Sequence, residues 1–204
     1  SIITLTALVC LVGVPYTVLM PVFAAEVLGG GADTLGFLMT ATGCGALFGA
    51  LWLAARRTVT GLPRNIAVAG AIFSLGLTAF AVSRVLWLSL VLLVIVGFGF
   101  ITMVASANTL LQTIVDDAKR GRVMSFFLMA YFGTTPFGSL VAGSVSARIG
   151  APFTLAACGL LCLAGVAWFG SVLRTLQADI QPIYARLGLS RAATAVPSTA
   201  EAEP

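Results

Sequence analysis

The sequence predicts an all-α membrane protein with six transmembrane helices, and three observations carry this prediction. Hydrophobic residues make up 59 % of the 204 residues and charged residues only 9 %, whereas a soluble domain carries roughly 25 % charged residues. The mean hydropathy is accordingly high, at +1.08. Six stretches reach the length of about 20 mostly apolar residues that a helix needs to cross the hydrocarbon core.

The six predicted spans follow one another with short connections, and each connection carries charge. Charged residues end each span because they are unfavourable within hydrocarbon. In order, the spans cover residues 1–25, 34–55, 65–83, 85–107, 123–147 and 151–173, which together form one transmembrane unit, 1–173. The charges that bound them are Glu26 after the first, Asp33 and Arg56 around the second, Arg64 and Arg84 around the third, Asp116 after the fourth, Arg122 before the fifth, and Arg148 and Arg174 around the sixth.

Lys and Arg residues are distributed unequally between the two sides of the predicted bundle. Nine of the 11 lie in the second connection, the fourth connection and the C-terminal segment, against Arg84 and Arg148 on the other side. Positive residues close to the ends of transmembrane helices mark the cytoplasmic side. The sequence therefore predicts a multi-pass protein whose two chain ends both face the cytoplasm.

Polarity rises after residue 173. Residues 174–191 predict a short amphipathic cytoplasmic segment, broken at Pro182, with apolar residues such as Leu176 and Ile180 facing lipid. Residues 192–204 are dominated by Ala, Thr, Pro, Ser and Glu, a composition typical of a disordered tail. Because the first residue is Ser within an apolar run, we expect the chain to be a fragment or a processed piece.

The residues that the chain lacks disfavour several classes of function. Histidine, the commonest general base and metal ligand, is absent. The four cysteines lie in apolar runs without a CxxC pair, as packing residues do. The spans contain neither GxSxG nor HExxH, and no pair of carboxylates lies at membrane depth. We therefore expect no enzymatic activity, no metal, no cofactor and no nucleic-acid partner.

Glycine and proline cluster near the middles of four predicted helices. If the helices form two units of three in opposite orientation, the first corresponds to the fourth and the second to the fifth. Breaks in corresponding helices of two inverted units indicate a binding site at the membrane midplane. The expected breaks are Pro15 in the first helix, Gly43 and Gly45 in the second, Gly97 in the fourth, and Gly133 and Pro136 in the fifth.

Small residues recur at every fourth position on two of the helices. Gly45 and Gly49 form a GxxxG pattern on the second helix, and Ser139, Gly143 and Ala147 form a similar ridge on the fifth. In lipid, where packing drives helix association, such ridges allow two helices to approach closely. We expect both ridges to be helix contacts.

Two stretches carry a resemblance to a known family, NTLLQTIVDDAKRGRVMS at residues 108–125 and FGTTPFGSLVAG at residues 132–143. Over residues 1–173 the chain resembles the C-terminal six-helix half of a major facilitator superfamily transporter, in the branch of the enterobactin exporter, the macrolide efflux proteins and the transmembrane secretion effectors. The resemblance implies half of a major facilitator fold, built as a 3+3 inverted repeat, in a bacterial cytoplasmic (inner) membrane. It also implies a partner, the N-terminal six-helix half.

The charged run at residues 116–122 has two interpretations. As a basic connection, Lys119, Arg120 and Arg122 anchor two helix ends on the cytoplasmic side. This does not explain Asp116 and Asp117, which we expect at the inner end of the fourth helix. There the helix dipole is unfavourable to anions, so they would need cationic partners. The resemblance adds a second role, because charged cytoplasmic loops of such transporters pair with helix ends while the cavity is closed to the inside.

The second connection, ARRTVTGLPRN at residues 55–65, stands where the superfamily carries a Gly- and Arg-rich signature loop. Arg56 and Arg57 therefore belong to the same predicted cytoplasmic gate. The aspartate of the signature is absent, since no carboxylate occurs between Asp33 and Asp116. This departure puts the usual charge-relay role of the loop in doubt.

The resemblance further implies a small-molecule substrate, bulky and amphipathic like a drug or a siderophore, that is exported at the expense of a proton gradient. No titratable residue lies near the middle of a span, so we expect the proton carrier in the missing half. Aromatic and hydroxyl residues remain for the substrate cavity. They are Tyr16, Thr17, Thr102, Ser106, Tyr131, Thr134 and Thr135.

Two alternatives stay open at this point. For the Thr and Ser candidates, a hydrogen bond back to the same helix is the alternative to substrate binding. For the whole chain, the alternative to a transporter is a channel-like protein or a non-transporting membrane scaffold. Six helices can line a pore, although no TVGYG-like filter and no acidic residue within a span supports a channel.

The charge asymmetry predicts the labelling of single cysteines. We expect Thr60→Cys and Ala118→Cys, each in a background without the four native cysteines, to react with impermeant thiol reagents only from the cytoplasmic side, because both positions lie in basic connections. Labelling of right-side-out and inside-out vesicles measures this. Reaction of both positions with the reagents from the outside would show that the orientation is the opposite of the predicted one.

Overall fold

The computed structural model describes residues 2–56 and 61–186, and all regular structure within them is helical. Arg57 of the predicted gate and the predicted tail 192–204 lie outside the described residues. In chain order the elements are α1 Ile2–Leu8, η1 Val9–Gly13, α2 Tyr16–Val22, η2 Phe23–Val27, α3 Ala32–Ala54, α4 Leu62–Val82, α5 Leu86–Ile114, α6 Asp117–Leu128, η3 Met129–Gly133, α7 Thr135–Ile149 and α8 Ala151–Arg186, where η marks a π-helix.

Six helices of the described residues are long and apolar enough to cross a membrane, as the sequence predicts. Their bounds are Ile2–Val27, Ala32–Ala54, Leu62–Val82, Leu86–Ile114, Ala118–Ile149 and Ala151–Leu173. The last helix, α8, continues beyond Leu173 to Arg186 and is not broken at Pro182, where the sequence predicts a break. A proline removes a single backbone donor, so a helix can bend there without ending.

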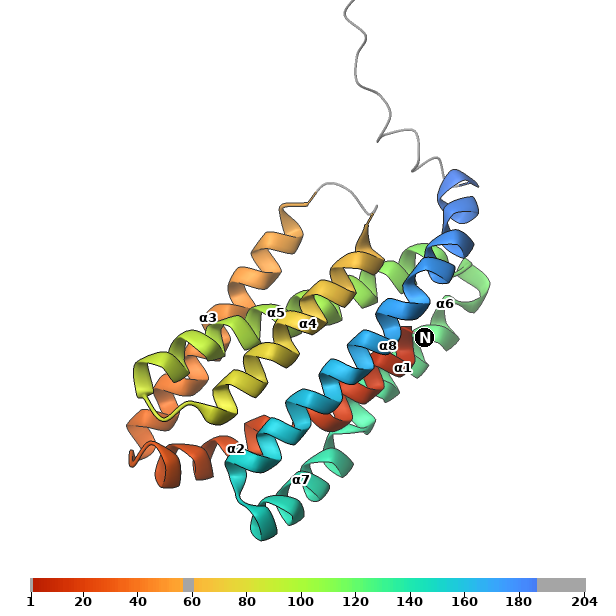
Figure 1. The fold of residues 1–204 in the computed structure, drawn as a ribbon. Helices are drawn as coiled ribbons and strands as arrows, with labels where there is room; N and C mark the ends of the chain where they lie inside the picture. The colour runs from red at the N-terminus through yellow and green to blue at the C-terminus, as the bar shows by residue number, and fades with distance from the viewer. Residues whose placement is uncertain (1, 57–60, 187–204) are drawn as a thin grey trace, which may run out of the picture.

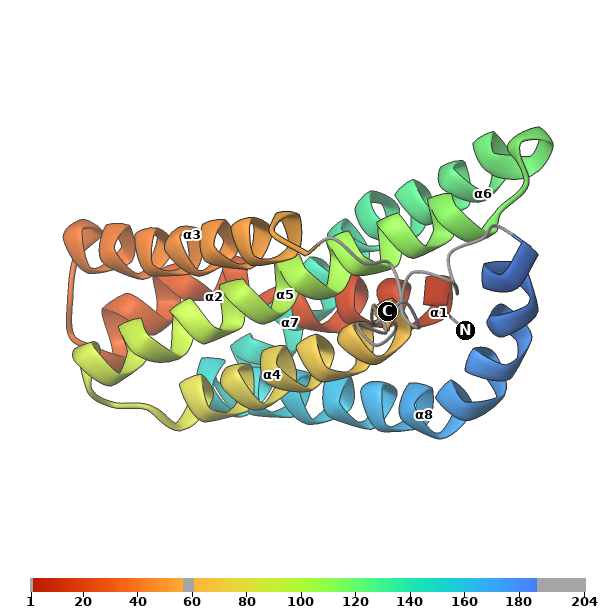
Figure 2. The same ribbon diagram turned by 90° about the horizontal axis from the view of Figure 1, so that it is seen from above.

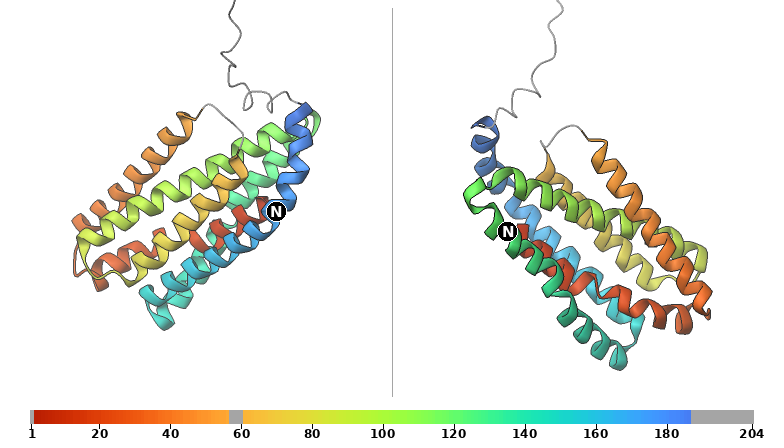
Figure 3. Two further views of the ribbon diagram at one scale, coloured as in Figure 1. Left: turned by 45° about the horizontal axis from the view of Figure 1, so that its top comes forward. Right: turned by 180° about the vertical axis from the view of Figure 1, so that it is seen from behind.

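The helix ends gather at two opposite ends of the bundle. The C-terminal end of α3, the N-terminal end of α4, the turn between α5 and α6 and the C-terminal end of α8 lie at one end (Figure 1). The connections α2–α3, α4–α5 and α7–α8 lie at the other (Figure 3). The unequal distribution of basic residues along the chain therefore corresponds to two physical ends. The end with more basic residues is termed the basic end below.

The helix α5 is packed between α3 and α4 (Figure 2), and glycines allow the backbones to touch. A Cβ added at Gly45 of α3 would strike the backbone of α5, and one at Gly49 would lie 2.9 Å from the carbonyl oxygen of Phe98. On the other side of α5, a Cβ at Gly99 would lie 2.6 Å from the backbone nitrogen of Phe73 in α4. The GxxxG pattern of the second helix is therefore a helix contact.

No break occurs at Gly43, Gly45 or Gly97, contrary to the sequence-based expectation, because α3 and α5 are continuous helices. A Cβ at Gly97 would strike the carbonyl oxygen of Thr42 in α3, so this glycine serves close packing. Glycine in a helix interior costs about 1 kcal/mol relative to alanine. The backbone contacts on both sides of α5 offset that loss. Breaks in corresponding helices of the two inverted units are therefore not found.

The first and fifth spans are the interrupted ones. In the first, the N–H of Val14 donates to the carbonyl of Val9 at 3.1 Å, which closes a π turn, and Pro15 follows without an N–H to donate. In the fifth, η3 ends at Gly133, and α7 has Pro136 in its first turn. π turns inside helices are frequent at functional sites.

The two interruptions touch each other. Pro15 has no N–H to offer to the carbonyl of Leu11, four residues before it. Gly138 of α7 packs on this carbonyl, since a Cβ at Gly138 would strike the Leu11 oxygen and lie 2.9 Å from the ring of Pro15. The first and fifth spans are thus joined at their irregular segments.

The charged run is the beginning of a helix and not a connection. α5 extends to Ile114, Asp116 occupies the N-cap position of α6, and Asp117 is the first residue of α6. The expectation that both aspartates lie at the unfavourable end of the fourth helix is therefore wrong, because the dipole at the start of a helix favours anions. The cause is helix length: the 29 residues of α5 extend about 43 Å, beyond the roughly 30 Å of the hydrocarbon core.

The packing of α5 predicts the effect of a single methyl group. We expect Gly97→Ala to lower the free energy of unfolding by about 1–3 kcal/mol, because the added carbon meets a backbone carbonyl that side-chain motion cannot relieve. Gly43→Ala is the matched control, since its Cβ would meet no atom within 4 Å. Thermal unfolding in detergent measures both variants. Equal transition temperatures for the two would contradict the packing role of Gly97.

Candidate functional site

Five aromatic residues form a series from the core of the bundle to its surface, and we term them the aromatic ladder. Tyr16 of α2 stands edge-on to Phe73 of α4 with ring centroids 6.3 Å apart. Phe73 lies 5.5 Å from Phe100 of α5, and Phe100 lies 6.3 Å from Tyr131 of η3. Tyr131 finally meets Phe132 edge-on at 4.6 Å. Contacts of this kind add about 0.5–1.5 kcal/mol each beyond apolar burial.

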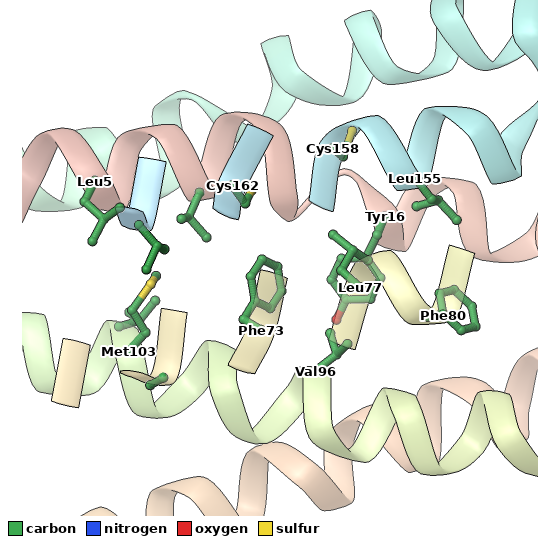
Figure 4. Packing of buried hydrophobic residues seen from close by; sticks show 14 of the residues in the cluster. Leu5, Tyr16, Phe73, Leu77, Phe80, Val96, Met103, Leu155, Cys158 and Cys162 are labelled. Carbon is green, nitrogen blue, oxygen red and sulfur yellow. The ribbon is translucent and has the colours of Figure 1, made fainter. Parts of the chain in front are cut away.

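The inner part of the ladder belongs to the core. Phe73 is fully buried and Tyr16 is 4 % exposed, and both lie among the packed side chains of the core in Figure 4. The Tyr16 hydroxyl is engaged by the side chain of Thr42 on α3, and the Thr42 hydroxyl donates to the carbonyl of Leu38 at 3.0 Å. The Tyr16 ring and hydroxyl thus lie inside the bundle, next to α3.

The outer part of the ladder lines two open hollows that share Tyr131 and Phe132. One hollow, of about 450 Å³, lies between η1 and the start of α7 and includes Thr135 and Ser139. The other, of about 280 Å³, lies between α5 and α6 and includes Asn108. Tyr131 is half-buried, whereas Phe132 is 66 % exposed. These spaces are termed the Tyr131 hollows.

The hydroxyl candidates divide into two groups. Thr17, Thr134 and Thr135 each donate back to their own helix, at 3.0, 2.7 and 2.9 Å, to the carbonyls of residues 14, 130 and 131. Thr102 and Ser106, one turn apart on α5, are buried, and neither hydroxyl has a hydrogen-bond partner in the described part of the chain. Helix back-bonding, the alternative considered for all of them, therefore holds for the first group only.

The structure brings together only part of the predicted substrate set. Tyr131 and Thr135 share one hollow, and Tyr16 joins them through the ladder. Thr17 is exposed on α2 and lines neither Tyr131 hollow, and the buried Thr102 and Ser106 also lie outside both.

Sequence reasoning missed two polar residues of the hollows. Asn108 lies in the second hollow, and its side-chain carbonyl accepts a hydrogen bond from the Gln112 amide at 3.0 Å. Ser139 is half-exposed in the first hollow. Asn108 stands within the quoted family-like stretch, and its spacing of four residues from Gln112 was a usable signal for a helix-surface pair. For Ser139 the sequence contained no signal of a place in a hollow, because its membership of the small-residue ridge indicates only a helix contact.

The predicted gate residues lie at the basic end, away from the hollows. Lys119, Arg120 and Arg122 are exposed in the first two turns of α6. Arg56 lies just after α3, with its guanidinium carbon 4.9 Å from the ring centroid of Trp52. The side chain of Asp117, like Arg57, lies outside the described part of the structure.

The lining of the Tyr131 hollows determines what they can bind. The rings of Tyr131 and Phe132 offer stacking surfaces, and the Tyr131 hydroxyl and the Asn108 amide offer hydrogen bonds. Within the described part of the chain, no charged side chain lines either hollow. Among the residues that the structure describes, no group of three or more His, Cys, Asp or Glu residues is placed to hold a metal ion. The hollows thus combine an apolar, partly aromatic lining with a few hydrogen-bonding groups.

Comparison with known proteins gives one match. The model of the family described as transmembrane secretion effector matches residues 2–188. No curated protein and no solved structure matches the chain.

The opposite faces of α7 predict a difference in thiol reactivity. Ser139 lines a Tyr131 hollow, whereas Val141, two residues on, lines an apolar cleft between α7 and α8 and is 61 % exposed. We expect Ser139→Cys to react at least about tenfold faster with a charged methanethiosulfonate than Val141→Cys, because thiols that face lipid seldom ionise. An uncharged, lipid-soluble maleimide should reduce the difference. Faster reaction of Val141→Cys with the charged reagent would contradict this assignment of faces.

Proposed function

Because the chain belongs to the transmembrane secretion effector family, a family of the major facilitator type, we propose that it forms one half of a secondary active transporter. The substrate class that we propose is bulky amphipathic compounds, such as drugs or siderophores, carried out of the cell. The family and the six membrane-spanning helices support a multi-pass membrane transporter. The substrate class rests on the family resemblance and on the lining of the Tyr131 hollows.

The observation that carries the proposal is the pair of Tyr131 hollows. They are open, they are lined by aromatic rings with a few hydrogen-bonding groups, and they adjoin the interruptions of the first and fifth spans. A ligand pocket of mainly apolar lining with a few polar groups selects an amphipathic molecule. Irregular helix segments next to such a pocket are typical of transporter binding sites.

The proposed partner is a second six-helix half. α3 buries only Leu38, Gly45 and Gly49, and the second and fifth spans have the smallest buried shares of the six, 17 % and 22 %. At the middle of the small-residue ridge of the fifth span, a Cβ at Gly143 would meet no atom of the described residues within 4 Å. Ridges of this kind favour close helix packing in lipid, so these two spans are the proposed interface.

Proton coupling is the proposed energy source, and its carrier belongs to the partner half. A carrier of protons needs a titratable group in the cavity at membrane depth. The carboxylates of the described spans lie at helix ends, and Glu26 in η2, near the end opposite the basic one, is exposed. Of the residues that the structure describes, no carboxylate lines either Tyr131 hollow.

The basic end is the proposed cytoplasmic side, and the membrane is the bacterial cytoplasmic membrane. Lys119, Arg120 and Arg122 on α6 are proposed to contribute to an inner gate by pairing with carboxylates at neighbouring helix ends. Such contacts must break in each transport cycle, and exposed ion pairs of up to about 1 kcal/mol are weak enough for that. A channel-like protein or a membrane scaffold is the alternative to this proposal.

Transport in proteoliposomes tests the proposed function. We expect saturable, proton-gradient-driven uptake of a fluorescent amphipathic compound when the chain is joined to its proposed partner half, and none for residues 1–204 alone, because one wall of the cavity is then missing. In the joined protein, Tyr131→Ala should reduce kcat/KM about tenfold, equivalent to about 1.4 kcal/mol. Thr17→Ala is the matched control and should stay within about twofold.

Three outcomes would contradict the proposal. Saturable accumulation by residues 1–204 alone would make the chain a complete or dimeric carrier. Flux that rises without saturation would favour the channel-like alternative. An equal effect of Tyr131→Ala and Thr17→Ala would remove the Tyr131 hollows as the substrate site.

A further inference from the structure

A groove runs between α3 and α4 with α5 as its floor. α3 and α4 each pack on α5 and lie on opposite sides of it (Figure 2). The groove encloses a hollow of about 120 Å³ whose lining residues differ from those of the Tyr131 hollows. Its lining is Trp52 from α3, Asn65, Val68, Ala69 and Ile72 from α4, and Phe98 and Thr102 from α5.

The lining changes from polar to apolar along the groove. Trp52 lies two residues before the end of α3 and Asn65 lies in the first turn of α4, so both are at the basic end. Val68 and Ile72 follow one and two turns further along α4, toward the middle of the span. The groove is thus amphipathic in the direction of the membrane normal, like a phospholipid.

Arg56 stands at the polar end of the groove, and Arg64 lies in the first turn of α4 at the same end of the bundle. The Arg56 guanidinium lies over the ring of Trp52, which itself meets Phe98 edge-on with centroids 6.0 Å apart. Arg64 is exposed and adjacent to Asn65. The first turn of α4 contains no acidic residue and has no side-chain cap, so the helix dipole adds partial positive charge at the same place.

No acidic side chain of the described residues neutralises these cations. The sequence has no carboxylate between Asp33 and Asp116, and the structure gives neither Arg56 nor Arg64 an ion pair within residues 2–56 and 61–186. An anion from outside the chain is therefore the complementary partner. Guanidinium groups bind phosphate through two parallel hydrogen bonds, more specifically than an ammonium group does.

The floor of the groove contains a polar group without a partner. Thr102 is 2 % exposed, and its hydroxyl has no hydrogen-bond partner in the described structure. By contrast, the buried Ser74 on the neighbouring helix donates to the carbonyl of Gly70 at 2.8 Å. A buried hydroxyl left without a partner is unfavourable, and an acceptor close to the groove floor would remove that penalty.

We propose that the α3–α4 groove binds one anionic phospholipid, with its phosphate at Arg56 and Arg64 and an acyl chain along Val68, Ile72 and Phe98. Basic pockets between transmembrane helices on the cytoplasmic side bind anionic headgroups in this manner. A soluble anion would use the arginines but not the apolar wall. An acidic peptide would not cover the apolar wall either, because Val68, which is 50 % exposed, would still face the bilayer.

Quenching of Trp52 fluorescence by brominated lipid tests the proposal on the full chain in liposomes. Trp87→Phe and Trp168→Phe leave Trp52 as the reporter. We expect brominated phosphatidylglycerol to reach half-maximal quenching at a mole fraction at least about fivefold lower than brominated phosphatidylcholine. Arg56→Gln with Arg64→Gln should abolish the preference, since one basic residue near the surface contributes about fivefold, while Lys at both positions should retain most of it. Each intensity is divided by that in the same lipid without bromine.

Matched controls separate groove binding from general charge attraction. Arg84→Gln with Arg148→Gln removes the same charge from the opposite end and should leave the preference unchanged. In a variant that keeps Trp87 as its single tryptophan, at the opposite end, quenching should show no preference for brominated phosphatidylglycerol. Glycerol phosphate in the buffer should not compete; full competition would mean a phosphate site and no lipid site. Equal quenching by the two lipids, or a preference that survives the Arg56 and Arg64 double Gln variant, would overturn the proposal.

Discussion

The direct contact of the α5 backbone with its neighbours is the constraint on which the rest of the structure depends. Lipid supplies no hydrophobic force between helices, so close packing decides where a helix lies. Gly97 and Gly99 let α5 touch α3 on one side and α4 on the other. From this position, Phe100 reaches Tyr131 and completes the aromatic ladder. The same position makes α5 the floor of the groove that contains Thr102.

The sequence was sufficient for the fold class because hydrocarbon leaves few choices for a backbone. Six apolar runs of spanning length had to become helices, and they did. The positions of breaks were harder to infer. Gly97 and Gly133 look alike in sequence, yet one is a packing contact in a continuous helix and the other ends a π turn. The difference depends on which helix lies opposite, and no local pattern records that.

The candidate site was predictable for residues whose chemistry is unusual in a membrane span and not for the others. A phenol at membrane depth needs a hydrogen-bond partner or water, and both predicted tyrosines belong to the aromatic ladder. The hydroxyls of Thr and Ser carried no such signal, because they can bond to their own helix. The aspartates of the charged run were misplaced since an error of a few residues in a helix boundary exchanges one end of a dipole for the other.

The contact between Gly138 and the carbonyl of Leu11 has a consequence for how this sequence can diverge. Pro15 withdraws the donor that this carbonyl would have in a regular helix, and only a residue without a Cβ fits against the oxygen. A substitution that straightens the first span releases position 138 from its requirement for glycine. A larger residue at 138 is compatible with this packing only after the first span has moved. Positions 15 and 138 should therefore vary together among homologous sequences, although 123 residues separate them in the chain.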